Sequence, residues 1–325
     1  MTYLENSKQY TGSDLENIFF RPMLTGESAQ DLGVRVLYNM PQPTHVQLWD
    51  GQRNILQKFT SAGWAGGKAA TKYEKTVNLN RVKAELGFSA ANYFSMVYEK
   101  VSSLVNTHMD DLSGTELEQA ETALFKQALA ENIRVTMWIG DTSAASGYNT
   151  FDGLLKRING LVDDDGVYNF SYQAAALEDP AYVVELFDKL WAGADPRIPG
   201  LKADDRLAYF VSSGIYRLYE KYLDAKGADA AYADAMNGRR TLAYHGIPVV
   251  DVRLGSYLGA TSFRQSFVML TDRRNLVLAV NTADMPGNEV RMWYNPDEME
   301  NRQRAVFMAG CDVLDEGLVA FASRI

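Results

Sequence analysis

The sequence predicts an α+β fold, and three of its features support this prediction. From Thr115 to Ile139, apolar residues recur at four-residue spacing without Pro or Gly, which is typical of one long helix. Two β-like stretches precede this helix, and strand-forming residues dominate Glu289 to Tyr294 and Ala305 to Phe321. Between them helical and strand patterns alternate, so we expect an α/β lobe in the middle of the chain.

The composition is that of a globular chain that folds without covalent cross-links. Its 325 residues predict two lobes, or one large domain with a long excursion, and the 46% apolar residues exclude disorder throughout. A net charge of −9 repels phosphate backbones and disfavours a dedicated nucleic-acid binder. The only cysteine, Cys311, excludes an intrachain disulfide and lies in an apolar stretch, which predicts a buried, inert thiol. Neither a signal peptide nor an apolar run long enough to span a membrane is found, so neither export nor membrane insertion is indicated.

Residues 1–44 are expected to form an extended arm. Three Pro and three Gly divide them into short apolar pieces such as Ile18 to Phe20, which leaves no room for a helix of useful length. A segment of this kind can dock on a neighbouring chain instead of its own body.

Residues 45–90 are expected to form a long basic hairpin. The β-like stretches Val46 to Phe59 and Thr71 to Leu79 flank a glycine-rich tip at Gly63 to Gly67. Residues 51–84 carry seven Lys or Arg against Glu74 alone, a net charge of +6 in an acidic protein. We therefore predict that this hairpin contacts another subunit through Arg53, Lys58, Trp64, Lys68, Lys72 and Lys75.

The start of the long helix offers an acidic partner for this hairpin. Residues 110–121 contain no Lys or Arg, and their acidic members are Asp110, Asp111, Glu116, Glu118 and Glu121. Thr115 and Glu118 form a capping box, and Gly140 is a suitable end for a helix of about 37 Å.

The rest of the chain contains six further predicted elements. Five of them are helices at Ala181 to Trp191 and Ile215 to Leu223, and strands at Arg206 to Val211, Phe263 to Leu270 and Leu276 to Val280. A single strand is also expected to run through Tyr244 to Val250.

No catalytic, cofactor or metal site is predicted. His45, His108 and His245 lie far apart in the sequence, and none has a second ligand at metal-binding spacing. A phosphate-loop interpretation of Ala62 to Ala69 fails, because Ala occupies the positions that require Gly and Ser or Thr. The run Asp163 to Gly166 resembles part of a calcium loop, but it lacks the first and last ligands, so we interpret it as a solvated turn.

The order of these elements resembles the major capsid protein of tailed bacteriophages with the Hong Kong 97 fold. The local pieces that support the resemblance are Ile139 to Asp141 followed by Phe151 to Leu155, the Tyr244 to Val250 stretch, Asn275 to Val280 and Leu318 to Phe321. The resemblance implies a shell protein without enzymatic activity or cofactor. It would assign 1–44 to the N-arm, 45–90 to the E-loop, 91–158 to the first part of the P-domain with spine helix 115–139, 159–283 to the A-domain and 284–325 to the returning P-domain strands.

The resemblance also implies partners and a location. The chain would assemble with itself into hexamers and pentamers in the bacterial host cytoplasm, contact a portal protein and enclose DNA in the virion without strong specific binding. Relatives with a built-in scaffold carry a long helical extension before the arm, so the 44-residue arm here predicts a separate scaffolding protein. An encapsulin-type nanocompartment shell remains an alternative, as does a soluble oligomeric α/β enzyme.

Some relatives cross-link their shells with an isopeptide bond, and the resemblance extends this hypothesis to the present chain. The ingredients would be a hairpin lysine among Lys68, Lys72 and Lys75, the amide of Asn301, and Asp315 or Glu316 as the proton acceptor. Ordinary charged surface is the preferred interpretation of the same residues.

Overall fold

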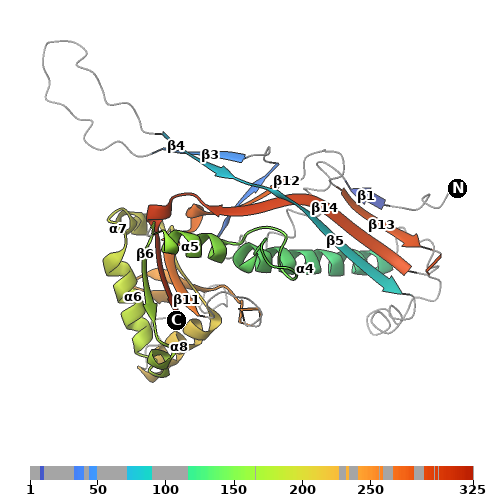
Figure 1. The fold of residues 1–325 in the computed structure, drawn as a ribbon. Coiled ribbons are helices and arrows are strands. Elements are labelled where there is room, and N and C mark those ends of the chain that lie inside the picture. The colour runs from blue at the N-terminus through green and yellow to red at the C-terminus, as the bar shows by residue number, and fades with distance from the viewer. Residues whose placement is uncertain are drawn as a thin grey trace, which may run out of the picture.

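The computed structural model describes residues 8–10, 33–39, 44–49, 72–89, 116–164, 166–226, 232–233, 241–255, 257–258, 266–281, 289–295, 297–298 and 300–324. Within these residues the chain forms an elongated sheet that lies along a long helix, with a lobe of sheet and helices at one end and a narrow ribbon above the junction (Figure 1). The predicted α+β class therefore agrees with the arrangement of the described elements.

The elongated sheet has six strands. They are β1 (Lys8–Tyr10), β13 (Glu289–Asn295), β14 (Glu300–Val313), β12 (Leu276–Asn281), β2 (Arg35–Tyr38) and β5 (Asn80–Ser89). The central strand β14 pairs along one edge first with β13 and then with β12, and along its other edge with β5. Odd-numbered residues from 301 to 309 in β14 are buried and even-numbered ones are half-buried, as the two-residue period of a strand requires.

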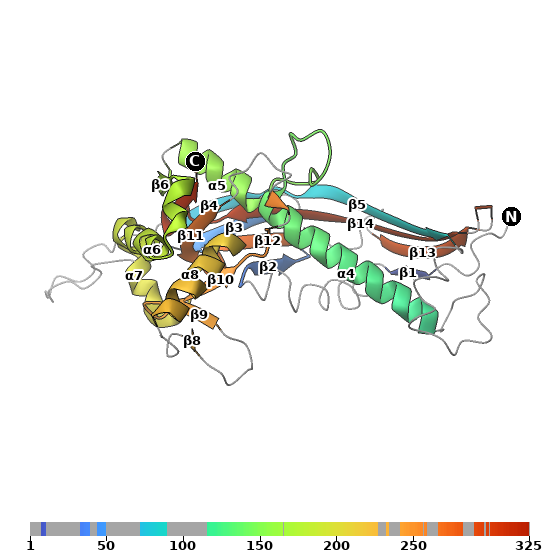
Figure 2. The same ribbon diagram turned by 90° about the horizontal axis from the view of Figure 1, so that it is seen from below.

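The long helix α4 (Glu116–Ile139) lies against the buried face of this sheet (Figure 2). Phe125, Leu129 and Ile133 are buried at the predicted four-residue spacing, so the helix expected at 115–139 is confirmed within one residue. At its end Trp138 packs between Phe210 and Phe267, with ring centroids 5.7 and 6.2 Å away. The helix therefore joins the elongated sheet to the lobe. A shorter helix, α5 (Leu154–Asp163), follows it.

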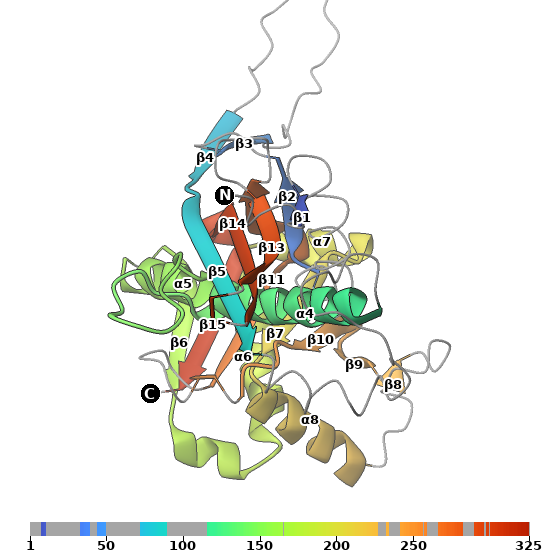
Figure 3. The same ribbon diagram turned by 90° about the vertical axis from the view of Figure 1, so that its right-hand side faces the viewer.

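The lobe is built on a seven-stranded sheet, whose strands follow one another across Figure 3. In spatial order they are β6 (Tyr168–Tyr172), β15 (Val319–Arg324), β11 (Phe267–Asp272), β7 (Leu207–Val211), β10 (Ile247–Asp251), β9 (Thr241–Tyr244) and β8 (Tyr232–Ala233). One face packs against α6 (Tyr182–Gly193), α7 (Ile198–Leu201) and α8 (Ser213–Ala225), and the other against α5 and the end of α4. Four 3-10 turns complete the lobe and its connections: η2 (Ala174–Glu178), η3 (Lys202–Asp204), η7 (Arg273–Asn275) and η8 (Glu316–Leu318).

The ribbon consists of two antiparallel strands, β3 (Thr44–Trp49) and β4 (Lys72–Val77). Its base packs on the face of the elongated sheet that lies opposite α4. The apolar cluster there contains Val46, Val77, Leu79, Val277, Ala279 and Leu314. The two predicted β-like stretches thus pair as expected, whereas the glycine-rich tip lies outside the described residues.

The predicted strand through Tyr244 to Val250 is wrong, because this stretch is a hairpin. β9 ends at Tyr244 and β10 begins at Ile247, while His245 and Gly246 have φ values of 51° and 78°. Two successive residues at positive φ reverse the chain as in a type I′ turn, whose twist suits antiparallel strands. His245 is not a common turn residue, so the turn is hidden within an apolar run.

The predicted boundary at residue 283 does not follow the sheets. β12 precedes it but pairs with β14 in the elongated sheet, and β15 follows it but pairs with β11 in the lobe. The reason is topological: β11 and β12 are separated only by η7, and β14 and β15 only by a short turn containing η8, so both connections cross between the two sheets.

Two described stretches of residues 1–44 pair with the chain's own elongated sheet: β1 pairs with β13, and β2 pairs with β12. Both strands satisfy backbone groups at open sheet edges, which is a physical reason for them to fold back.

Candidate functional site

The predicted contact residues are only partly covered by the structure. Six of them lie outside the described residues: Arg53, Lys58, Trp64, Lys68, Asp110 and Asp111. Four lie in described strands or helices, but their side chains are not described: Lys72, Glu116, Glu118 and Glu121. Their contacts with another subunit remain predictions, and Lys75 alone can be followed to a partner.

Lys75 joins the base of the ribbon to the lobe. Its Nζ donates a hydrogen bond of 2.8 Å to Oε1 of Glu316, which lies in η8 just before β15. The two side chains are 31% and 41% exposed, so solvent screens the pair and limits it to about 0–1 kcal/mol. The structure therefore brings one predicted hairpin lysine to an acid of its own chain.

Next to this pair, Arg197 holds the turn between β14 and β15. Its Nη1 donates to Oδ2 of Asp315 at 2.7 Å and its Nε donates to Oδ1 of Asp195 at 3.1 Å. Hydrogen bonds from Arg197 to Asp315 and Asp195 raise the pKa of the guanidinium. The side-chain amide of buried Asn275 donates to the carbonyl of Asp315 at 2.8 Å and accepts from its N–H at 2.7 Å. This turn is consequently fixed from both sides.

These groups line a cleft of about 760 Å³ between the base of the ribbon and the lobe. Its described lining residues are Arg35, Glu74, Lys75, Arg197, Leu201, Arg206, Asp272, Arg274, Asn275, Leu314, Asp315, Glu316, Gly317 and Leu318. Among these lining residues there is no Ser, Thr, Cys, His or Tyr. The lining instead supplies guanidinium and carboxylate groups, which suit ion pairing with a charged surface.

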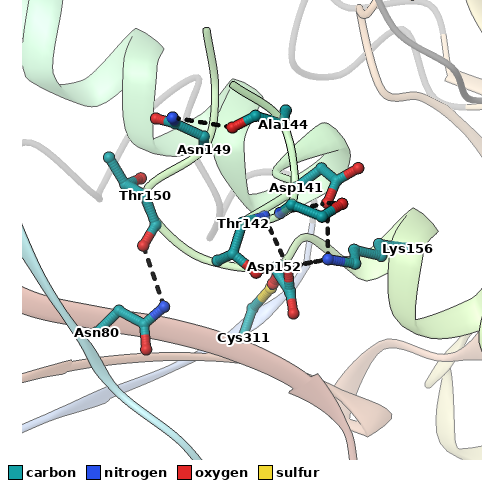
Figure 4. A network of polar contacts seen from close by, with 10 residues as sticks. Asn80, Asp141, Thr142, Ala144, Asn149, Thr150, Asp152, Lys156 and Cys311 are labelled. Atoms are coloured by element: carbon teal, nitrogen blue, oxygen red, sulfur yellow. Dashed lines mark hydrogen bonds and ion pairs between the residues drawn. The ribbon is translucent and has the colours of Figure 1, made fainter. Parts of the chain in front are cut away.

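A second polar cluster holds the loop that leaves α4 (Figure 4). Nζ of Lys156 donates to Oδ1 of Asp141 at 2.7 Å and to Oδ1 of Asp152 at 2.6 Å. The hydrogen bond from Lys156, with two more from Ser143, lowers the pKa of Asp141 to about 2. Lys156 lies on α5, so this cluster, the Lys156 clamp, ties the two sides of the loop to one helix.

The thiol of Cys311 lies beneath this clamp. It is 1% exposed, and its Sγ donates to the carbonyl of Asp152 at 3.1 Å. Burial raises the pKa of Cys311, so the prediction of a buried, inert thiol is confirmed.

A third cluster connects α4 to the lobe. The buried Arg134 donates from Nη1 to the carbonyl of Val252 at 2.8 Å and from Nη2 to Oε1 of Glu131 at 2.7 Å. The hydroxyl of Tyr257 donates to the same carboxylate at 2.8 Å. The guanidinium thus donates hydrogen bonds to the first backbone carbonyls after the end of β10, and it fixes α4 against the lobe.

The components proposed for an isopeptide bond are separated within one chain. Asn301 is buried near the start of β14, and Asp315 and Glu316 follow its end. At about 3.3 Å per residue the strand places them roughly 40 Å apart. A single chain therefore does not bring the asparagine and its proton acceptor together.

Sequence patterns do not identify this cleft. Lys75, Arg197, Asn275 and Asp315 come from four separate parts of the chain, and the crossing of the two sheets brings them together. The one local signal is the turn sequence Asp315-Glu316-Gly317, which predicts a tight connection but no partner.

No group of three or more His, Cys, Asp or Glu side chains in the described part of the chain is placed to hold a metal ion. The helices of that part include none that combines the length and apolar character needed to cross a membrane.

Comparison with known proteins gives a result only at the level of structure. No protein-family model and no curated protein sequence matches the chain. A chain in the satellite phage P4 procapsid, a structure that includes the size determination (Sid) protein, is 11% identical. The match covers 94% of this chain and 89% of that one, with a TM-score of 0.56.

Two further solved structures are similar over comparable lengths. The capsid of Myoviridae phage XM1 is 12% identical, with 91% of each chain covered and a TM-score of 0.49. The capsid of a native GTA particle is 13% identical, with 93% of this chain and 91% of that one covered and a TM-score of 0.47. Together with the two crossing sheets and the long helix, the procapsid match shows that this chain has the fold of a phage capsid protein.

Proposed function

We propose that this chain is the major capsid protein of a tailed bacteriophage, which assembles into an icosahedral shell around a double-stranded DNA genome. The observation that carries the proposal is the shared fold with a phage procapsid chain over 94% of the sequence. The ribbon supports it, since its described base packs on the elongated sheet and the basic segment 51–84 that it belongs to would find acidic partners on a neighbouring chain. The net charge of −9 suits a shell that makes few and weak contacts with DNA.

The proposal assigns a role to each part of the fold. The ribbon would be the E-loop, α4 the spine helix of a P-domain built on the elongated sheet, and the seven-stranded lobe the A-domain. Copies of the chain would form hexamers and pentamers in the bacterial cytoplasm and become the virion shell. A portal protein and a separate scaffolding protein would be its other partners.

Sedimentation and negative-stain microscopy of the purified protein, expressed with its genomic neighbours, test the proposal. A phage shell protein should form closed particles in the megadalton range. Oligomers of a few subunits would contradict a shell and favour the enzyme alternative. Closed particles that enclose protein cargo would instead support an encapsulin-type nanocompartment.

Expression of the chain alone tests the scaffold separately. Aggregates, tubes or shells of mixed size are expected if a second protein directs assembly. Uniform closed shells of the size formed with the neighbouring genes would show that no separate scaffold is needed.

A further inference from the structure

One end of the seven-stranded sheet carries charged groups in a fixed order. β6, β15 and β7 begin at this end and β11 finishes there, because β11 is antiparallel to β15 and β7 while β6 is parallel to β15. The turn after α5 precedes β6, η8 precedes β15, and η7 follows β11. The cleft at the base of the ribbon runs along this end of the sheet.

The acids of the cleft already have partners within the chain. Glu316 accepts from Lys75, Glu74 lies 2.8 Å from the ring of His45, and Asp315 accepts from Arg197. Asp272 caps η7 by accepting from the N–H of Arg274 at 2.8 Å, and the lining residue Arg206 has its own partner in Asp204, 3.5 Å away.

Two arginines of the cleft have no carboxylate as an ion-pair partner among the described residues. Arg35 and Arg274 line the cleft, both are exposed, and among the described residues neither guanidinium has an ion pair or hydrogen bond. Arg35 lies on β2, the edge strand of the elongated sheet, and Arg274 lies in η7, which contacts β2. Within the described part of the chain, these two guanidinium groups therefore make no ion pair, and they lie beside an edge strand of the elongated sheet.

The end of α5 presents the opposite charge. Asp163 is its last residue and Asp164 follows it, and both are exposed. The last turn of α5 contains no basic residue, so two carboxylates lie at the negative end of the helix dipole. This arrangement is unfavourable within one chain, and an external cation would relieve it.

The two surfaces face different sides of the molecule. Figure 3 shows α5 on the left flank and β2 with α7 on the right flank. Two strand spacings, about 10 Å, separate the start of β6 from the end of β11, where Arg274 lies. Among the described residues no ion pair joins Asp163 or Asp164 to Arg35 or Arg274, so the acidic end of α5 does not pair with these arginines in its own chain.

We propose that Asp163 and Asp164 of one copy dock against Arg35 and Arg274 of the next copy, so that a charged head-to-tail contact joins neighbouring subunits. The inference rests on the proposed shell function and specifies one contact within it. Because the two surfaces differ, the contact is heterologous, and in the proposed shell it would repeat around each ring of six or five subunits.

Charge exchange tests the contact. The variant Arg35→Glu with Arg274→Glu, and the variant Asp163→Lys with Asp164→Lys, should each lower the fraction of chain found in particles about tenfold, because the pair repeats in every subunit. Combining all four substitutions should restore particles. The matched control is Arg217→Glu with Lys221→Glu, two exposed positions on α8, which should assemble like the wild type.

Chemical cross-linking tests the geometry independently of stability. The only native cysteine is buried, so cysteines introduced as Asp164→Cys and Arg35→Cys would be the reactive thiols. A chain carrying both should give a ladder from dimer to ring size with a short bismaleimide. Each single variant should remain monomeric on a denaturing gel.

The outcomes separate this inference from the proposed function. The contact would be overturned, and the shell function left intact, by three results together. These are particles from the wild-type chain, no rescue of particles by the fourfold exchange, and no cross-linked ladder from the double-cysteine chain. Dimers from a single-cysteine variant would also overturn it, since they require a contact between identical surfaces. Failure of the wild-type chain to form particles would overturn the proposed function itself.

Discussion

The lobe and the ribbon are stabilised in opposite ways. In the lobe, β7 and β11 are buried on both faces, and Phe187 packs against the rings of Tyr209, Tyr219 and Tyr244 with centroids about 5 Å away. Among the described residues, the base of the ribbon is tied to the rest of the chain by one small aliphatic cluster and by the half-exposed pair of Lys75 and Glu316. The lobe can therefore fold by its own burial, whereas the described part of the ribbon obtains less stabilisation from its own chain.

Because of this difference, we expect substitutions in the lobe and in the ribbon to change different quantities. Substitutions in the lobe should change the free energy of unfolding of the isolated chain, because the contacts they remove are internal. Substitutions in the ribbon should change particle formation more than folding, because the surface that covers the ribbon belongs to another subunit in the proposed shell. Four predictions test this contrast, from the largest expected effect on stability to the smallest.

Phe187→Ala should have the largest effect. Phe187 is fully buried, so the substitution leaves a cavity among three tyrosine rings and should lower the free energy of unfolding by about 3–5 kcal/mol. Chemical denaturation of the unassembled chain measures this change. Val184→Ala, at a half-buried position on the same helix, is the control and should cost clearly less. Equal losses for both variants would contradict the role of the aromatic core.

Gly310→Ala should act at the base of the ribbon. A Cβ on Gly310 would lie 2.1 Å from the carbonyl oxygen of Asn78, where the chain passes from the ribbon into β5, so the backbone must shift. We expect a loss of about 1–3 kcal/mol and faster hydrogen exchange at Val77 and Leu79. Gly160→Ala in α5 has open space around it and should stabilise the helix by about 0.5–1 kcal/mol. A Gly310→Ala chain with unchanged exchange at the ribbon base would contradict the close approach.

The same contrast explains which elements can be predicted from sequence. Local patterns are sufficient for α4, with its uninterrupted four-residue period, and for β7 and β12, which are short continuous apolar runs. They are insufficient for α5, where Gly160 interrupts a short helix that is fixed by packing against β14. β5 does carry a local signal, because exposed charges at 81, 83 and 85 alternate with apolar residues at 82, 84 and 86, although it is not among the predicted elements.

The candidate site is less predictable than the fold. The sequence identifies a basic hairpin and names Lys75, but it assigns Lys75 to a neighbouring chain, whereas the structure places its Nζ against Glu316. Arg35 and Arg274 carry no motif at all. Their significance depends on which described residues around the cleft form ion pairs, and the crossing of the two sheets is what brings these residues together.

Asp141→Asn removes one carboxylate of the Lys156 clamp and should have an intermediate, pH-dependent effect on the free energy of unfolding. The pKa of Asp141 is about 2 instead of its ordinary 3.8, so the folded state favours the charged carboxylate. This contribution is present above pH 3.8 and is lost as the pH falls towards 2. Solvent near the clamp limits it to about 1 kcal/mol. Denaturation of the wild type and of Asp141→Asn at several pH values should show that the difference in their free energies of unfolding shrinks over this interval. A difference that grows on acidification would contradict the role of the clamp.

The double variant Lys68→Glu with Lys72→Glu should have the smallest effect on stability and a large effect on assembly. Lys68 lies near the predicted tip and Lys72 opens β4, whereas Lys75 is already paired with Glu316 and is therefore left unchanged. Substitution of an exposed charge changes the free energy of unfolding by less than about 0.5 kcal/mol, and we expect both lysines to be exposed before assembly. In the proposed shell each lysine faces the acidic segment 110–121 of a neighbour, and weak pairs add up over many copies.

Salt distinguishes a contact of this kind from a folding defect. The double variant should form fewer particles than the wild type at low salt, with unchanged denaturation curves for the unassembled chain. The particle yields of the double variant and the wild type should converge at high salt, because screening weakens attraction and repulsion alike. Lys75→Gln is the matched comparison: it removes an internal tie and should lower the free energy of unfolding by up to about 1 kcal/mol while leaving the salt dependence of assembly unchanged. Normal particles from the double variant at low salt would show that these lysines are ordinary solvated charges. The ribbon would then contribute to assembly through its shape and not through its charge.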